Sequence, residues 1–418
     1  MRVIAYILLV MLGWMVYPAG NPALAEEEKK FNMTYIYHGS LSSHADYVKA
    51  TKGSLDVVSP NYFDLTKNGE LKITQRFQAS FVLAVHNQGI KVVPFLSNHW
   101  DIEAGINGLE NREKLSQDIA DAVKKYNLDG VNINIEGVNY EYRDKHTDFI
   151  RLLRKKIPSN KEVSVAVVAN PRGFTTGWHG FYDYKKLHLY SDYLMMMTQD
   201  EHWEGSEPGP VASLSFTERS IQYALNQGVP KNKLVVGIPF YGRIWKLDGP
   251  AQDGQVIKGK GIPNHEVETL VRHFGGTFFY DEESENPKAN FTIPKGHHYY
   301  AGNIKLTEGS YEVWYGNDRS FQKKLRTISR FDVKGTGSWS LGQEPASIWD
   351  FYTSFLNGQV FRDVGKNYWA RESILQVYDK GWMRGTKTDL FSPNQYLTRA
   401  QGAVILIRAL GLDERVPK

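Results

Sequence analysis

Eight strand-like runs alternate with helix-like segments along most of this 418-residue chain. The segments between the runs, such as 111–126, 143–157 and 216–227, carry apolar residues at intervals of three and four, which is typical of amphipathic helices. Eight strands joined by helical crossovers predict an α/β fold, the (β/α)8 TIM barrel. The predicted strands are residues 33–39, 55–63, 91–97, 130–136, 163–169, 192–199, 233–240 and 335–342.

The fourth run, residues 130–136, has one apolar face and one polar face. Its polar face carries Asn132, Asn134 and Glu136, because alternate side chains of a strand point to opposite sides. The interior of a barrel is normally filled by branched apolar residues, so polar groups there are costly unless they are hydrogen-bonded or take part in chemistry. Glu136 comes last, at the carboxyl end of the strand, where the active sites of this fold lie. The pattern therefore predicts a site around Glu136.

Two further units are predicted beyond the barrel strands. Residues 246–316 separate the seventh and eighth strands and contain short aromatic, β-prone pieces divided by Gly, Pro and Asn, which predict an inserted α+β lobe beside a cleft. The composition changes again after residue 358, and residues 361–412 have the pattern of a small all-α unit. At about fifty residues, this unit is near the lower limit for independent folding.

Residues 1–25 have the features of a secretory signal peptide. Arg2 precedes the apolar run 3–16, and Ala23 and Ala25 supply the small residues of a cleavage site before Glu26. An uncleaved membrane anchor is the alternative, but the run is shorter than a spanning helix. We therefore expect a secreted protein with no membrane contact after signal removal.

The overall composition narrows the function classes. A formal charge of +4 is too small to indicate binding of nucleic acid. The absence of cysteine excludes thiol nucleophiles and thiolate metal sites. Aromatic residues make up 13% of the chain, which suits stacking on carbohydrate as well as core packing.

Several motifs at predicted strand ends bear a family resemblance. The segments 129–138, 200–213, 237–245 and 312–315 resemble glycoside hydrolase family 18, the chitinase and endo-β-N-acetylglucosaminidase family, and especially its spore-cortex and cell-wall branch. The resemblance covers residue 31 to about 356. It implies a barrel enzyme without a cofactor or catalytic metal that cleaves β-linked N-acetylhexosamine glycans, such as peptidoglycan or chitin-like polymers.

The match to the family's catalytic motifs includes three departures. The signature D-G-x-D-x-D-x-E becomes Asp129, Gly130, Asn132, Asn134 and Glu136, so Glu136 matches the general acid. Asn134 replaces the Asp that orients the substrate's acetamido group, and Asn132 replaces a second supporting Asp. In the strand-six motif M-x-Y-D, Gln199 replaces the Tyr that holds the acetamido oxygen. Glu136, Asn134 and Gln199 are thus the predicted catalytic residues.

These departures leave two function classes open. In this family the acetamido oxygen of the substrate itself attacks the anomeric carbon while a protonated carboxyl assists the leaving group. An Asn accepts the acetamide N–H but brings no charge, so transition-state stabilisation falls. A related family of endo-β-N-acetylglucosaminidases nevertheless works with Asn-x-Glu at this position. The chain is expected to be a glycosidase, and the alternative is a glycan-binding, lectin-like protein. With those carboxylates lost, the pKa of Glu136 must be raised chiefly by burial.

Other residues are expected to contact the substrate, and for several of them a purely structural role is the alternative. Trp339 on the eighth strand is the expected platform for a sugar ring, unless it is simple core. Tyr241 and Arg243 either line the cleft or pin the inserted lobe. The alternative for Glu136 is a structural carboxylate paired with an Arg such as Arg243. The imidazoles of the His297–His298 pair lack a partner carboxylate at ligand spacing, so a surface loop is expected there. The predicted substrate-binding residues are Asn132, Asp200, Tyr241, Arg243, Trp339, Trp203 and Tyr62; His202, Asn61, His99 and Trp100 are weaker candidates.

The C-terminal unit, residues 358–418, carries a second resemblance. F-x-D-V at 361–364, Trp369-Ala370, G-W-M-x-G at 381–385 and 397–401 (LTRAQ) resemble an S-layer homology (SLH) module. That resemblance implies binding of a secondary cell-wall polymer through Trp382 and Arg399, and hence a cell-wall or spore location. Gln401 replaces the family's usual Glu, and the chain has one copy of a module that normally occurs in threes. The alternative role for this C-terminal unit is a helical cap that covers the barrel.

Overall fold

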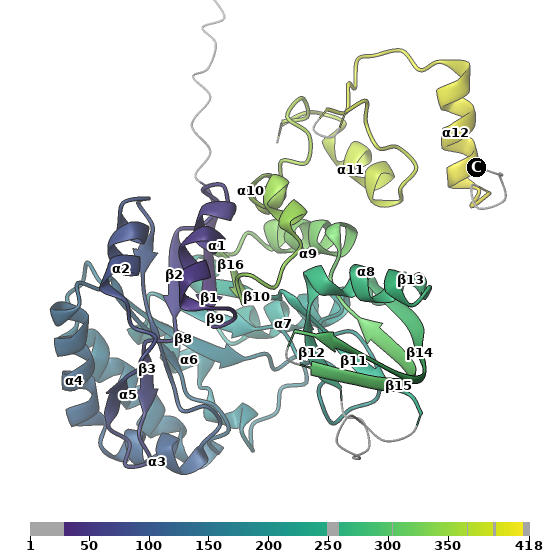
Figure 1. Cartoon of the computed structure of the whole chain (residues 1–418). Coiled ribbons are helices and arrows are strands. Elements are labelled where there is room, and N and C mark those ends of the chain that lie inside the picture. The colour runs from purple at the N-terminus through teal and green to yellow at the C-terminus, as the bar shows by residue number, and fades with distance from the viewer. Residues whose placement is uncertain (1–28, 249–258, 303, 366, 388–389, 413–418) are drawn as a thin grey trace, which may run out of the picture.

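The computed structural model describes residues 29–248, 259–302, 304–365, 367–387 and 390–412. The expected signal peptide, residues 1–25, and the expected mature start at Glu26 lie outside the described residues. Figure 1 shows a barrel, an inserted lobe packed beside it and a helical C-terminal unit.

The barrel is a closed ring of parallel strands. Its strands are β1 (Phe31–Ile36), β2 (Val57–Pro60), β5 (Lys91–Val92) with β6 (Phe95–Ser97), β7 (Gly130–Asn134), β8 (Glu162–Val168), β9 (Tyr193–Met197), β10 (Leu234–Pro239) and β16 (Gly335–Trp339). Each pairs with the next in parallel, and β16 pairs with both β10 and β1. The ring closes through residues 91–97, where β5 pairs with β2 and β6 pairs with β7. The predicted (β/α)8 barrel is confirmed.

Two of the predicted strands are interrupted in the structure. Strand three divides into β5 and β6 around Pro94, whose ring nitrogen has no hydrogen to donate, although its carbonyl accepts from the backbone N–H of Asn132 at 2.9 Å. Strand two stops at Pro60, and the chain then forms the short strands β3 (Phe63–Leu65) and β4 (Leu71–Ile73). Proline thus ends regular pairing at both places.

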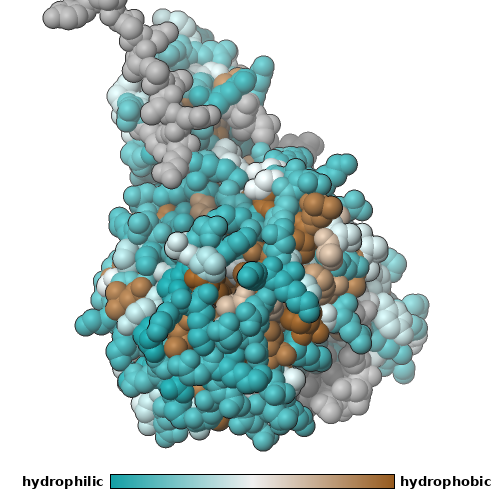
Figure 2. Space-filling model, turned by 90° about the vertical axis from the view of Figure 1, so that its left-hand side faces the viewer, coloured by the Kyte–Doolittle hydropathy of each residue, from teal (hydrophilic) through white to brown (hydrophobic). Residues whose placement is uncertain are grey.

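Helices surround the ring and are buried along one face. They are α1 (His44–Ala50), α2 (Ala79–His86), α3 (Ile102–Glu110), α4 (Arg112–Lys125), α5 (Arg143–Lys156), α6 (Tyr184–Tyr190), α7 (Leu214–Asn226) and α9 (Asp318–Phe331). Three of them match the predicted segments within two residues: α4, α5 and α7. The side of the barrel that carries α2 and α4 in Figure 1 is mostly hydrophilic in Figure 2, with scattered hydrophobic patches. This is the surface expected of amphipathic helices.

The inserted lobe is a five-stranded sheet with one helix against it. Its strands run in the order β12 (Lys260–Pro263), β11 (Tyr241–Lys246), β15 (Ile304–Trp314), β14 (Asn286–Ala301) and β13 (Thr277–Asp281), and α8 (Asn264–His273) packs on them. The insertion begins at Tyr241, five residues before the predicted start. Two of the short β-prone pieces of this region, residues 290–294 and 298–300, belong to the single strand β14, whose register against β15 shifts between Ile293 and His298. Gly296, with φ near 78°, lies at this irregularity. The irregularity explains why the β-prone pattern is interrupted between residues 294 and 298.

The C-terminal unit contains α11 (Arg371–Asp379) and α12 (Arg399–Ala409) and follows α10 (Tyr352–Leu356). Phe361, Val364, Ile374 and Leu375 belong to the same apolar core as the barrel. In contrast, α12 has no buried residue, and Leu406 is 64% exposed. Among the described residues, no helix has the length and apolar character needed to cross a membrane.

Candidate active site

Glu136 follows β7 and is held through its backbone. Asn98, just after β6, accepts a hydrogen bond from the Glu136 N–H and donates one to its carbonyl oxygen, both at 2.8 Å. The hydroxyl of Tyr182 donates to the carbonyl of Ile135 at 2.9 Å. Asn98 and Tyr182 are both buried. Their hydrogen bonds therefore hold the backbone in place at the position from which the Glu136 side chain extends.

The carboxyl of Glu136 lies in an environment that favours its protonated form. Burial raises its pKa from 4.5 to about 7, and the negative charge of Asp200 contributes to the rise. The positive charge of His99 opposes it. A carboxyl that keeps its proton near neutral pH has the property required of a general acid. The expectation that burial would be the main cause agrees with these contributions.

Two amide oxygens at the ends of β7 and β9 have no hydrogen-bond partner among the described residues. Oδ1 of Asn134 and Oε1 of Gln199 are both buried. Asn134 precedes Glu136 by two positions, roughly 6.6 Å along the strand and on the same face. A buried carbonyl oxygen without a donor is costly in a folded protein, so both groups are available to bind polar hydrogens of a ligand.

Asn132 has a different position from its neighbour. Its Oδ1 accepts a hydrogen bond from the Tyr35 hydroxyl at 2.9 Å, and its Nδ2 donates to Ser164 at 2.8 Å. The side chain is completely buried, with its two polar atoms paired inside the barrel. Its polar atoms are therefore used within the barrel, and its assignment to substrate binding stays a prediction.

Asp200 forms an ionic cluster with the first strand of the lobe. Its Oδ1 accepts from the Tyr241 hydroxyl at 2.8 Å and pairs with the guanidinium of Arg243. Arg243 therefore pairs with Asp200, while Glu136 has no ion pair among the described residues. The cluster joins the β9 end to the lobe, so Tyr241 and Arg243 position Asp200 and at the same time fix the lobe.

Trp339 ends β16 and is half-buried among aromatic rings. Its ring stacks on Tyr37 at 5.6 Å and packs against Tyr35 at 5.2 Å and Phe95 at 5.8 Å. Tyr37 is 40% exposed, so this aromatic group reaches from the core to the surface. Trp339 is suited to carry a sugar ring, and Tyr37 is an aromatic neighbour that the sequence motifs did not single out.

Tyr62, a predicted substrate contact, is a core residue in the structure. It is only 2% exposed and packs edge-on against Phe77 at 5.2 Å. Pro60 ends β2 before it, and the chain then turns into β3. Strand-end position alone could not reveal this turn.

Trp203 and the weaker candidates near strands two, three and six have different surroundings. His99 forms an ion pair with Asp64 at 2.7 Å, which raises the pKa of His99, and Asn61 donates to the same carboxylate at 3.1 Å. Trp100 and Trp203 are largely exposed. A ring nitrogen of His202 lies 3.1 Å from the carbonyl of Pro210, so His202 shapes its loop.

Sequence reasoning missed Asn98, Tyr182 and Asp64. Asn98 directly precedes the candidates His99 and Trp100, so its place at the end of strand three was the available signal. Tyr182 lies 46 residues after Glu136 in the sequence, and no local pattern connects the two.

The predicted wall-polymer residues lie apart from the barrel site. Trp382 is half-buried, with Nζ of Lys380 4.5 Å from its ring centre. Arg399 is exposed at the first turn of α12, where Thr398 and Gln401 form a reciprocal capping box. Gln401 thus performs the helix-capping task that a Glu would perform. No cluster of three potential metal ligands occurs among the described residues, and His297 and His298 are exposed on β14, not in a loop.

Known proteins share both the fold and the sequence motifs of this chain. The profile of "Glycosyl hydrolases family 18" matches residues 28–344, and that of the "S-layer homology domain" matches residues 360–403. A putative sporulation-specific glycosylase, YdhD of Bacillus subtilis, is 28% identical over 236 residues, which cover 56% of this chain and 52% of that protein. The uncharacterized glycosylase YvbX of the same organism is 25% identical over 83% of this chain and 96% of its own length.

Solved structures agree at the level of the fold. The spore cortex-lytic enzyme SleL of Bacillus cereus superposes with a TM-score of 0.67 at 20% identity, covering 78% of this chain and 74% of that one. The C-terminal domain of a putative chitinase from Desulfitobacterium hafniense gives 0.67 at 26% identity, covering 79% and 99%. With the family profile extending over the whole barrel, this chain belongs to the glycosyl hydrolases family 18 and carries an S-layer homology domain after it.

Proposed function

We propose that this protein is a secreted, wall-attached glycosidase that hydrolyses β-linked N-acetylhexosamine glycans by a substrate-assisted, retaining mechanism. The observation that carries the proposal is the combination of a protonatable Glu136 with two buried amide oxygens, at the ends of β7 and β9, that have no partner among the described residues. The relatives support the substrate class by their names, which include cortical fragment-lytic enzymes of Bacillus and a tobacco class V chitinase in complex with NAG4. We therefore propose peptidoglycan or a chitin-like polymer as the substrate.

Glu136 acts as the general acid and then as the base. Its proton passes to the glycosidic oxygen as the bond to the anomeric carbon breaks, so the leaving sugar departs as a neutral alcohol. The acetamido carbonyl oxygen of the same sugar attacks the anomeric carbon and forms a cyclic oxazolinium ion. The Glu136 carboxylate then takes a proton from water as this water opens the ring, which restores the starting configuration.

Asn134 and Gln199 hold the acetamido group during this attack. Positive charge develops on the acetamide nitrogen, and its N–H donates to Oδ1 of Asn134, which has no other donor among the described residues. Gln199 contributes a second amide to the same substituent. An amide dipole stabilises this charge less than a carboxylate does, so a lower rate than that of family members with Asp is expected. Trp339 supports the apolar face of the sugar ring.

Hydrolysis of matched substrates tests the mechanism. An aryl β-N-acetylglucosaminide is compared with its analogue that lacks the 2-acetamido group, for the parent, Glu136→Gln and Asn134→Ala. The parent should cleave only the acetamido substrate, and Glu136→Gln should lose nearly all turnover. Asn134→Ala should lose about 3 kcal/mol of transition-state stabilisation, like the removal of one oxyanion-hole donor. Equal parent rates on both substrates would exclude acetamido participation.

A lectin-like role is the second candidate function. The observation that favours it is the presence of the neutral amides Asn132, Asn134 and Gln199 where the family's catalytic motifs have Asp, Asp and Tyr. Binding of wall glycan without any release of reducing ends from purified peptidoglycan or chitin oligomers would establish this role instead.

A further inference from the structure

A row of basic side chains follows one face of α9. Arg319, Lys323, Arg326 and Arg330 are spaced by four, three and four residues, which places them on a common side of the helix. This side faces the C-terminal unit: Arg326 and Arg330 both pair with Asp379 at the end of α11. The barrel therefore presents a basic surface to the unit that follows it.

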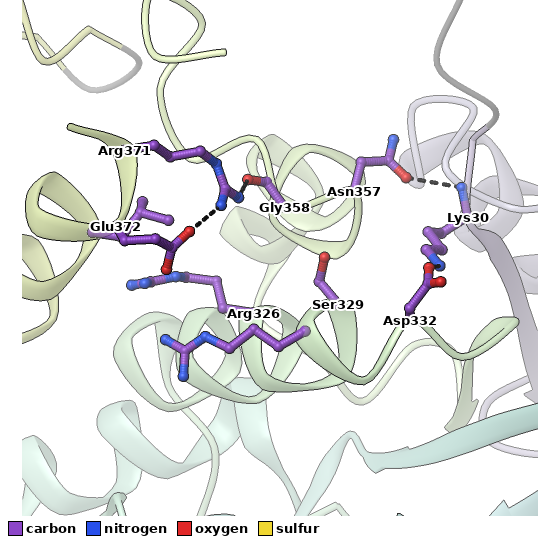
Figure 3. A pocket seen from close by; sticks show the side chains of 10 residues that line it. Lys30, Arg326, Ser329, Asp332, Asn357, Gly358, Arg371 and Glu372 are labelled. Carbon is purple, nitrogen blue, oxygen red and sulfur yellow. Dashed lines mark hydrogen bonds and ion pairs between the residues drawn. The ribbon is translucent and has the colours of Figure 1, made fainter. Parts of the chain in front are cut away.

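Two hollows open along this junction, and in the smaller one each basic side chain pairs with a carboxylate. It has a volume of about 330 Å³, and Figure 3 shows Arg371 with Glu372 and Gly358 on one side and Lys30 with Asp332 and Asn357 on the other. Arg330 pairs with Asp379. Its cations therefore already have anionic partners within the protein.

The larger hollow has more cations than anions. Its volume is about 810 Å³, and Glu282, Glu285 and Asp379 are the acidic residues that line it. These three carboxylates pair respectively with Arg319, Lys323 and Arg326. The basic residues that line it are Arg319, Lys323, Arg326, Lys380, Arg384 and Arg408.

Three cations therefore have no carboxylate partner. Arg384 and Arg408 form no side-chain hydrogen bond or ion pair with any residue that the structure describes, and Lys380 lies over the Trp382 ring at 4.5 Å. Such a surplus in a concave site attracts an anion, because the surrounding walls lower the local dielectric screening.

Arg326 lines both hollows and is nearly buried. Its side chain is only 4% exposed, and its Nη2 is buried without a hydrogen-bond partner in the described part of the chain. Burial lowers the pKa of Arg326 to about 10, and the charge of Arg330 contributes to this. An unpaired guanidinium N–H at such a position costs free energy unless an acceptor reaches it.

We propose that the larger hollow binds phosphate or carboxylate groups of an anionic wall polysaccharide, with the barrel helix α9 and the segment 380–384 on opposite sides of the polymer. Guanidinium groups bind these oxyanions through paired, charge-assisted hydrogen bonds. Tyr378 also lines the hollow and offers a ring to a sugar face. The volume lies in the range of about 300–1,000 Å³ that is typical for ligand sites, well above the need of a single small ion.

This inference rests on the wall attachment in the proposed function but assigns it to different residues. It places part of the polymer site on the catalytic barrel, away from Arg399. A polymer bound in the larger hollow would hold the C-terminal unit against α9. Binding of the polymer would therefore fix the orientation of the barrel relative to the polymer.

Sedimentation with purified cell walls tests the proposal. The chain without residues 1–25 is compared with the double variant Arg384→Gln/Arg408→Gln and with the control Arg272→Gln. Arg272 is 69% exposed on α8, pairs with Glu268 and does not line the hollow. The double variant should bind at least fivefold less at low salt and show a shallower salt dependence, while the control matches the parent. Equal binding by double variant and parent would overturn the proposal.

Treated walls distinguish the two anion sources. Hydrofluoric acid removes polymers linked by phosphodiesters, and carbodiimide amidation neutralises carboxylates. Binding of the parent should fall to the level of the double variant after one of these treatments, which identifies the anionic group. Undiminished binding after both treatments would contradict an anionic ligand.

A soluble assay separates this inference from the glycosidase proposal. Polyphosphate and polygalacturonate are titrated against the parent, and at least one should raise its melting temperature by several degrees more than that of the double variant. Failure of both to do so would also count against the site. Hydrolysis of soluble N-acetylglucosamine oligomers is measured separately, so loss or absence of activity does not affect the binding result.

Discussion

At the residue scale, the protonation of Glu136 links catalysis to stability. Its pKa in the folded protein is about 7, above the ordinary 4.5, so the folded state binds this proton more tightly than the unfolded state does. The resulting stabilisation is complete below the unfolded pKa and is lost as the pH rises through about 7. At higher pH, the buried carboxylate is destabilising, by about 3 kcal/mol from this shift.

The variant Glu136→Gln should therefore be more stable than the parent in alkaline solution, although it loses turnover. We expect its free energy of unfolding to exceed that of the parent by about 2–3 kcal/mol at pH 8, with little difference at pH 4. Urea unfolding at the two pH values measures this. A difference that does not change with pH would show that the carboxyl is not held protonated.

Asp200 raises the pKa of Glu136, and its replacement should reverse this effect. In Asp200→Asn the negative charge disappears and the charge of Arg243 is left without its partner. Both changes stabilise the Glu136 carboxylate, so the alkaline limb of the kcat/KM profile should move to lower pH. An unmoved limb would mean that Asp200 does not act on the acid.

Asn134→Asp provides the opposite perturbation on the other side of Glu136. A new carboxylate two residues away on the same strand face disfavours ionisation of Glu136. The alkaline limb of kcat/KM should move to higher pH, while Gln199 and Asn132 remain suited to an amide, so the rate should stay below that of family members with Asp. A pH–rate profile measured beside that of Asp200→Asn tests both signs, and a shift in the same direction would refute this electrostatic account.

At the scale of the elements, the turn after β7 is held by two residues from neighbouring connections, Asn98 after β6 and Tyr182 before α6. Asn98 satisfies both backbone groups of Glu136, and Tyr182 binds the carbonyl before it. The variant Asn98→Ala leaves a buried N–H and C=O unpaired, at a cost of about 1–3 kcal/mol in stability.

Asn98→Ala should also misplace the acid without altering its chemistry. We expect kcat to fall by about tenfold to a hundredfold, because small displacements of a catalytic group are expensive, while the alkaline limb of kcat/KM stays near its parental pH. Tyr182→Phe should show a milder version of the same pattern. A shifted pH profile with unchanged kcat would contradict a positioning role.

At the scale of the whole molecule, the C-terminal unit carries the S-layer homology domain and also contributes to the core. Phe361, Val364, Ile374 and Leu375 pack with the barrel, and Asp379 pairs with Arg326. Deletion of residues 358–418 should abolish sedimentation with walls and lower the melting temperature, because apolar surface near α10 becomes exposed.

The same truncated chain should still cleave soluble oligomers below its melting temperature, since the described active-site residues all precede residue 340. Loss of wall binding with retained cleavage is the expected result. Unchanged sedimentation would show that attachment does not depend on the C-terminal unit.

Short-range patterns determined much of this architecture. Alternation over residues 130–136 predicted a strand with an inward polar face, and three- and four-residue spacing predicted α4, α5 and α7. These periodicities arise from the geometry of single elements, which a few neighbouring residues encode. The place of Glu136 at the end of its strand followed from the same count, and so did the expectation that burial would raise its pKa.

Only the tertiary structure decided which side chains share an environment. Tyr62 and Trp339 both lie near predicted strand ends, yet a proline and a turn send Tyr62 into the core. The side-chain oxygen of Asn132 accepts a hydrogen bond from Tyr35, which is 97 residues away in the sequence. The side-chain oxygen of Asn134 has no hydrogen-bond partner among the described residues. Such pairings depend on barrel closure, which brings distant strands together, and no local spacing encodes that closure. The sequence therefore shows which residues have side chains suited to the chemistry. The packing of the folded chain decides which of these side chains reach the site.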